Sequence, residues 1–149
     1  MDTNDPPIVV EQTFNAPIAT VWKSITDLDQ MRQWYFETIE EFKPQVGFES
    51  RFTVSCEDRE FIHVWTITDV VPEQRIAYGW RYEGITGNST LVWELSDTPE
   101  GTKLTLTHTV LESFPQDDPM FSRESGQAGW DFFIHERLKA FLEPQSSQT

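Results

Sequence analysis

The stretch SGQAGWDFFIHERLKAFLE, residues 125–143, places one tryptophan, three phenylalanines, one isoleucine and two leucines among charged residues. On a helical wheel of about 100° per residue, its large apolar side chains cover roughly half of the circumference. The members of this stripe are Trp130, Phe133, Ile134, Leu138, Phe141 and Leu142. Arg137 falls inside the stripe and Phe132 on the far side. The pattern predicts a long C-terminal helix that packs a broad apolar face against a large partner.

That partner is predicted to be a sheet, because the hydrophobic period changes to two after Gly47. Alternating segments occupy residues 48–56, 61–71, 75–82, 89–96 and 102–110, and an earlier strand occupies residues 8–14. Two short helices are expected at residues 15–28 and 27–36. Strands followed by one long helix indicate an α+β fold, a curved antiparallel sheet gripping the helix. We expect a single domain over residues 8–143, with flexible ends at 1–7 and 144–149.

Hairpin turns predict which strand residues face one another. A tight turn at residues 97–101 would pair Leu95 with Leu104, Trp93 with Leu106, and Leu91 with His108. The other expected neighbours are Ile67 with Trp80, Asp69 with Tyr78, Trp80 with Leu91, and Tyr78 with Trp93. All these apolar residues share one face of the sheet. The opposite face is predicted to be solvated and carries Arg81, Glu94, Thr105 and Thr107.

Composition excludes several classes of partner. The chain has 149 residues, with 11 basic and 25 acidic residues and a net charge of −14. Such a charge repels nucleic acid and anionic lipid surfaces, so neither nucleic acid nor membrane is an expected partner. The N-terminus lacks a signal-peptide pattern, and no run approaches the ~18 apolar residues of a membrane span. We therefore expect a cytoplasmic protein.

Signals for catalysis are weak. Cys56 is the single cysteine and stands among acidic residues, which raise a thiol pKa. The three histidines lack metal-ligand spacing, and no phosphate loop, nucleophile elbow or paired-carboxylate motif occurs. The sequence therefore predicts no metal, no cofactor and no assigned catalytic residue. If the interior is catalytic after all, His108 or Tyr78 would be the acid or base.

Large rings on both the sheet and the helix either interlock or stand apart around a void, and both arrangements stay open. Polar groups with inward parity need partners, which a ligand or water can supply. A small apolar or aromatic molecule is the expected ligand. Its candidate contacts are Trp34, Trp65, Tyr78, Trp80, Trp93, His108, Phe121, Trp130, Phe133 and Arg137.

Two of these contacts have alternative interpretations. Arg137 either pairs with an anionic ligand group or reaches along its helix to Glu136 or Asp131. The loop at residues 112–125 is polar but includes Phe114, Met120 and Phe121. These apolar side chains either form a lid over the interior or pack onto the start of the helix.

Several motifs together resemble a known family. FNAPIATVWKSITDLDQMRQWY (14–35), WTITDVVPEQRIAYGW (65–80), STLVWEL (89–95), GTKLTLTH (101–108) and GWDFFIHERLKAFLE (129–143) resemble homologues of the activator of heat-shock protein 90 ATPase. These belong to the START-like (SRPBCC) superfamily, and the resemblance spans about residues 10–143. It implies a helix-grip fold with a cavity between the helix and the sheet.

The resemblance implies several functions, because the superfamily includes lipid carriers, hormone receptors and cyclases. The leading hypothesis is a container for a small hydrophobic molecule of unknown identity. The alternatives are a stress- or chaperone-associated interaction domain and an enzyme acting on an apolar ligand in the cavity. The co-chaperones that give the family its name carry an additional N-terminal chaperone-binding domain. This chain is expected to have no room for that domain.

Overall fold

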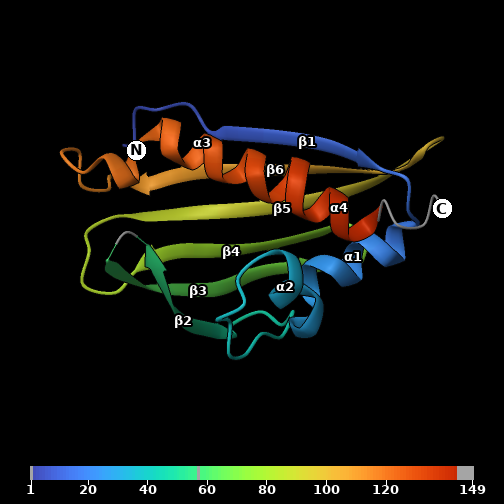
Figure 1. The fold of residues 1–149 in the computed structure, drawn as a ribbon, viewed down its shortest axis with the longest axis horizontal. Coiled ribbons are helices and arrows are strands. Elements are labelled where there is room, and N and C mark those ends of the chain that lie inside the picture. The colour runs from blue at the N-terminus through green and yellow to red at the C-terminus, as the bar shows by residue number, and fades with distance from the viewer. Residues whose placement is uncertain (1, 57, 144–149) are drawn as a thin grey trace.

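A computed structural model describes residues 2–56 and 58–143 and shows an α+β helix-grip fold (Figure 1). Within these residues the strands form one six-stranded antiparallel sheet, in the order β1-β6-β5-β4-β3-β2. The strands are β1 (Ile8–Phe14), β2 (Glu49–Cys56), β3 (Arg59–Val71), β4 (Arg75–Tyr82), β5 (Asn88–Thr98) and β6 (Gly101–Glu112). The helical elements are α1 (Ile18–Thr26), α2 (Leu28–Trp34), the 3₁₀ turn η1 (Pro119–Phe121), α3 (Arg123–Asp131), the π-helical segment η2 (Phe132–Leu138) and α4 (Lys139–Leu142).

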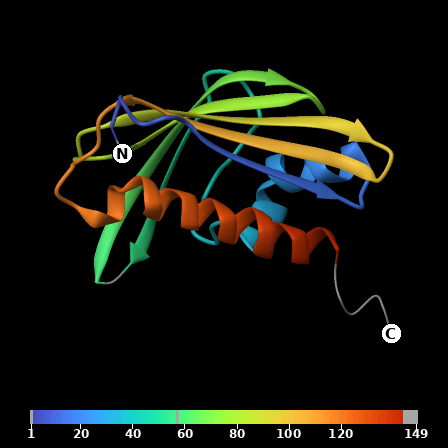
Figure 2. The ribbon, with the colours of Figure 1, turned by 90° about the horizontal axis from the view of Figure 1, so that it is seen from above.

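The long C-terminal helix, formed by α3, η2 and α4, lies along one face of the sheet, and the sheet curves around it (Figure 2). Helices α1 and α2 cover the same face near α4 (Figure 1). The side chain of Asp27 caps α2 by accepting a hydrogen bond from the backbone N–H of Gln30 at 3.1 Å. One face of the sheet is thus enclosed between helices, as the alternation of the strands predicts.

The predicted pairing of β5 with β6 is confirmed, since Leu95, Trp93 and Leu91 face Leu104, Leu106 and His108. These strands are joined by a two-residue turn, Thr98 facing Gly101. Such a turn leaves no freedom in the register.

The other two predicted registers are wrong, by two residues at Trp80 and Tyr78 and by one residue at Asp69. Trp80 faces Trp65 on one side and Ser89 on the other, while Tyr78 faces Ile67 and Leu91. The irregularity between Ile67 and Asp69 in β3 accounts for part of the shift between β3 and β4. A slip of two residues keeps Trp80, Tyr78 and Leu91 on their predicted face because the side-chain period is two.

The two faces of the sheet are as predicted. Trp80, Leu91, Trp93, Leu106 and His108 are buried. On the opposite face Glu94 is exposed, and Arg81, Thr105 and Thr107 are partly accessible.

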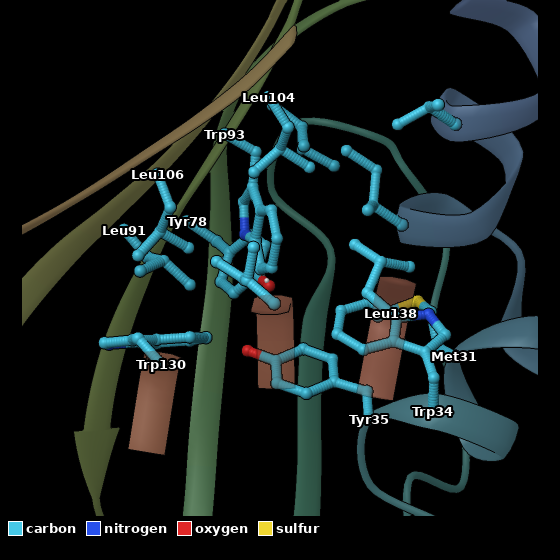
Figure 3. Packing of buried hydrophobic residues seen from close by; sticks show 14 of the residues in the cluster. Met31, Trp34, Tyr35, Tyr78, Leu91, Trp93, Leu104, Leu106, Trp130 and Leu138 are labelled. Atoms are coloured by element: carbon cyan, nitrogen blue, oxygen red, sulfur yellow. Dashed lines mark hydrogen bonds between the residues drawn. The ribbon is translucent and has the colours of Figure 1, made fainter. Parts of the chain in front are cut away.

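The end of the interior near α2 is filled by interlocking rings (Figure 3). Trp34 stacks on Tyr35 with 4.7 Å between ring centroids, and Trp93 meets Trp130 edge-on at 5.9 Å. Trp65 and Tyr78 belong to the same cluster. The alternative of a packed interior is therefore correct for this end of the molecule.

The predicted stripe of the C-terminal helix also faces the sheet. Trp130, Ile134 and Leu138 are buried, while Phe133, Phe141 and Leu142 are partly buried against the core. Phe132 is 46% exposed, which confirms its place on the far side. The seven residues Phe132–Leu138 are π-helical, a conformation that widens the turn and is frequent at functional sites.

The two ends of the chain were expected to be flexible. Arg123 donates hydrogen bonds to the carbonyl oxygens of Pro6 and Pro7, and the backbone N–H of Thr3 donates to Ser113 Oγ. Residues 2–7 are thereby held against the start of α3 and the end of β6. The prediction for residues 144–149 lies outside the described residues.

Candidate functional site

The end of the interior near the start of α3 is hollow. A cavity of about 260 Å³ lies between the sheet, the start of the C-terminal helix and the loop before it. It is lined by Phe36, Val54, Phe61, His63, Trp80, Tyr82, His108, Phe114, Met120, Phe121, Ser125, Gly126, Gly129, Trp130 and Phe133. We call this space the aromatic pocket. Most of its wall is aromatic, and none of these residues is an acid, a lysine or an arginine.

Helix α3 contributes small residues to the pocket wall. Ser125, Gly126 and Gly129 face the space that larger side chains would otherwise fill. A Cβ atom built on Gly129 would have no other atom within 4 Å. Glycine inside a helix costs about 1 kcal/mol relative to alanine. The helix therefore keeps an open face toward the pocket at a cost in its own stability.

The loop between β6 and α3 contributes two rings of a three-ring cluster that borders the pocket. Phe114 stacks on Phe121 with centroids 5.9 Å apart, and Phe61 of β3 meets Phe121 edge-on at 5.8 Å. Gly87 allows this arrangement, since it has a φ of 121° and a Cβ there would lie 2.3 Å from the Phe114 ring. We call Phe61, Phe114 and Phe121 the lid cluster. The loop packs on the sheet as well as bordering the pocket.

An ion pair holds the lid cluster in place. Arg59 and Asp118 lie 2.9 Å apart, and the Asp118 carboxylate also accepts a hydrogen bond from the backbone N–H of Met120. The hydrogen bond from Arg59 contributes most to lowering the pKa of Asp118 below its ordinary value. The carboxylate is thus kept charged where it caps the turn η1.

His108 joins the helix to the sheet. The indole Nε1–H of Trp130 donates to His108 Nδ1 at 3.2 Å, and His108 Nε2 lies 2.8 Å from Ser89 Oγ. Since an indole nitrogen only donates, Nδ1 must accept and the proton must sit on Nε2. Ser89 in turn donates to the carbonyl oxygen of Trp80 at 2.8 Å. Both ring nitrogens are therefore engaged.

Burial lowers the pKa of His108 to about 4, so the ring is neutral near pH 7. A neutral imidazole with two occupied nitrogens has no site left for proton transfer to a ligand. His108 shapes the pocket wall, which weakens its candidacy as an acid or base.

His63 lies on β3, and β3 is not a neighbour of β6 in the sheet. The curvature of the sheet nevertheless brings His63 and His108 into the same pocket. His63 Nδ1 lies 3.2 Å from the carbonyl oxygen of Phe61. Because a carbonyl only accepts, this nitrogen carries the proton and Nε2 is the acceptor. Burial lowers the pKa of His63 to about 4, so this ring is also neutral near pH 7.

Comparison with known proteins gives the family. The model of the family described as Activator of Hsp90 ATPase homolog 1-like protein matches residues 15–143. The chain belongs to this family. The resemblance seen in the sequence is thereby confirmed, together with the START-like (SRPBCC) superfamily. No match is found among curated proteins.

Solved structures similar to this Activator of Hsp90 ATPase homolog 1-like chain share its fold. Protein CV1439 from Chromobacterium violaceum has a TM-score of 0.78 at 19% identity, over 93% of this chain and 98% of its own. An uncharacterised protein from Rhizobium leguminosarum has a TM-score of 0.78 at 23% identity, over 93% and 95%. DynU16, a putative protein in the dynemicin biosynthetic locus, has a TM-score of 0.74 at 23% identity, over 94% of this chain and 48% of its own.

In this family member the predicted ligand contacts divide into two groups. The pocket wall includes Trp80, His108, Phe121, Trp130 and Phe133. The filled ring cluster near α2 includes Trp34, Trp65, Tyr78 and Trp93, which do not line the aromatic pocket. The parity of a strand residue predicts that it points inward, but it does not predict at which end the interior is hollow.

Arg137 lies apart from the aromatic pocket. Its Nη2 donates to the carbonyl oxygen of Gln33 at 2.9 Å and its Nε to that of Trp34 at 3.3 Å. These carbonyls end α2, so Arg137 caps that helix. The expected partners Glu136 and Asp131 are not the residues it binds.

Several pocket residues escaped the sequence analysis. The sequence predicts Tyr82 only as the end of a strand. It predicts Ser89, which contacts His108 without lining the pocket, only as the start of one. Gly126 and Gly129 carried a usable signal, since two glycines spaced by three within a predicted helix indicate a helix face without side chains. Val54 and Phe36 carried none.

Two further observations concern metals and membranes. Among residues 2–56 and 58–143, no group of three or more His, Cys, Asp or Glu side chains is placed to hold a metal ion. Cys56 ends β2, but its side chain is not among those described. None of the helices in the described part of the chain combines the length and apolarity needed to cross a membrane.

Proposed function

We propose that the protein binds a small, uncharged, ring-bearing molecule in the aromatic pocket. The observation that carries this proposal is the open space beside Gly129, in a wall made mostly of aromatic rings. Interiors are normally close-packed, and a void forfeits dispersion contacts for every atom that lines it. A ligand that fills the void would restore those contacts.

The pocket's size and lining limit the ligand. Its volume of about 260 Å³ lies just under the range of roughly 300–1,000 Å³ that is usual for ligand pockets, which favours a molecule of a few rings. A charged ligand would find no opposite charge among the lining residues and would lose its hydration. The proposal therefore concerns a neutral molecule, held by a protein that we place in the cytoplasm.

Binding should be detectable at the tryptophans of the pocket wall. Titration with naphthalene should shift the indole N–H signals of Trp80 and Trp130 saturably in ¹H–¹⁵N spectra, because both rings line the pocket. Trp22 lies on α1, away from the pocket, and its signal should stay in place. Shifts spread evenly over all indoles, or shifts that never saturate, would contradict a defined pocket.

Filling the pocket should abolish this response. Gly129→Leu adds a side chain where a Cβ meets nothing within 4 Å, so we expect at least tenfold weaker naphthalene binding. The same change should leave stability equal or raise it by up to about 1 kcal/mol, since leucine favours helix over glycine. The matched control is Ala128→Leu, which adds the same side chain on the exposed side of α3. Equal naphthalene affinity in the two variants would overturn the pocket proposal.

The same variants separate ligand binding from a chaperone-associated role. The family's description points to an Hsp90 ATPase activator, and a chaperone would contact exposed surface. Binding of purified Hsp90 should then be indifferent to Gly129→Leu. Chaperone binding without any naphthalene response would favour the interaction-domain alternative.

A further inference from the structure

Two polar side chains of the aromatic pocket, His63 and Tyr82, lie close together. The rings of His63 and Tyr82 meet edge-on with centroids 4.8 Å apart, and both residues line the pocket. Buried polar atoms in proteins are normally hydrogen-bonded, so those without a protein partner indicate what a ligand can supply.

His63 contributes an acceptor. Its Nδ1–H is used by the carbonyl oxygen of Phe61, which leaves Nε2 with a lone pair. Within the described part of the chain, Nε2 makes no hydrogen bond, and a water-sized molecule can reach it. Since His63 is only 5% exposed and lines the pocket, that access comes through the pocket. This lone pair would repel a carboxylate or a carbonyl oxygen of a ligand.

Tyr82 contributes a donor. Burial raises the pKa of the Tyr82 hydroxyl to about 12, so it keeps its proton. A phenolic O–H can donate one hydrogen bond. No described residue accepts a hydrogen bond from it.

An acceptor and a donor on adjacent edge-on rings match one chemical group, a hydroxyl. We propose that the ligand is an aromatic alcohol of the phenol type, whose O–H donates to His63 Nε2 and whose oxygen accepts from the Tyr82 hydroxyl. His108 takes no part, because Trp130 and Ser89 occupy both of its nitrogens. This inference rests on the proposed function and adds the class of ligand.

Three probes of similar shape test the inference: 2-naphthol, its methyl ether 2-methoxynaphthalene, and naphthalene. The ether can accept from Tyr82 but cannot donate to His63. We expect 2-naphthol to bind the unmodified protein about fivefold to tenfold more tightly than the ether, from the net contribution of one hydrogen bond. Affinities come from the shifts of the Trp80 and Trp130 indole signals. Equal affinity for naphthol and its ether would overturn the inference.

Two variants separate the two hydrogen bonds. His63→Phe keeps a ring of similar size, and it should bring the naphthol-to-ether preference to about one; this ratio is measured within one variant, so a general change in the affinity for ring molecules does not alter it. Tyr82→Phe should weaken the naphthol and the ether alike and so preserve their ratio. A preference that survives in His63→Phe would reflect the size of the methyl group and would refute the role of His63.

The outcomes also distinguish this inference from the proposed function. One outcome is saturable naphthalene binding that Gly129→Leu removes, without any preference for naphthol over its ether. This outcome would support the pocket proposal and refute the assignment of a phenol-type ligand. No saturable binding of any probe would overturn both. The comparison of the three probes uses the unmodified protein, so it does not depend on whether any variant folds.

Discussion

Replacing Trp130 with alanine should lower the free energy of unfolding by about 4 kcal/mol. Trp130 is 4% exposed and meets Trp80 at 5.4 Å and Trp93 at 5.9 Å between ring centroids. The substitution removes these contacts and also leaves His108 Nδ1 without its donor, which adds the cost of a buried unsatisfied acceptor. Because the ring borders the aromatic pocket, part of the new space joins an existing void. Urea denaturation at neutral pH measures the loss.

The neighbouring phenylalanine supplies a matched control. Phe132 is 46% exposed, and Phe132→Ala should cost at most about 1 kcal/mol. Trp130→Phe should fall between the two, since it keeps a ring but loses the indole donor. If Trp130→Ala and Phe132→Ala cost the same, the helix does not dock through Trp130.

Acidification from pH 7.5 to 5 should lower the free energy of unfolding by about 4 kcal/mol, about 2 kcal/mol for each buried histidine. Burial lowers the pKa values of His63 and His108 to about 4, below the ordinary value of 6.5 that they regain on unfolding. The unfolded chain therefore binds more protons between these values, and stability rises with pH. The contribution is complete above about pH 6.5 and is lost as the pH falls toward 4.

Denaturation curves over this pH range, for the unmodified protein and His63→Phe, test the assignment. Removing one of the two histidines should halve the dependence on pH. An unchanged pH dependence in His63→Phe would mean that this ring is not held neutral by burial. The test is independent of any ligand.

Local patterns in the sequence determined the elements of this fold. The alternation in residues 75–82 and 102–110 reflects one buried and one accessible sheet face, a property that each strand carries by itself. The apolar stripe of residues 125–143 likewise predicted which side of the helix docks. The short turn between Thr98 and Gly101 determined the β5–β6 register because two residues leave no alternative pairing.

Tertiary structure alone decided the irregular registers and the site. The bulge between Ile67 and Asp69 and the longer connection before β5 shift two strand pairings. Neither feature has a local sequence signal that predicts which residues pair on its two sides. Arg137 donates hydrogen bonds to carbonyl oxygens at the end of α2, over a hundred residues away in the chain. It does not pair with the acidic residues of its own helix. Contacts of such long sequence separation depend on how whole elements pack.

Where the interior is filled and where it is hollow was also a matter of tertiary structure. The sequence determined that many rings point inward, since parity is a local property. Sheet curvature brings His63 of β3 and His108 of β6 into one pocket although their strands are not neighbours. The hydrogen-bond partners of each histidine then decide that His108 is fully engaged and that His63 keeps an acceptor. Curvature and ring packing result from all elements together, so no single stretch of sequence contains them.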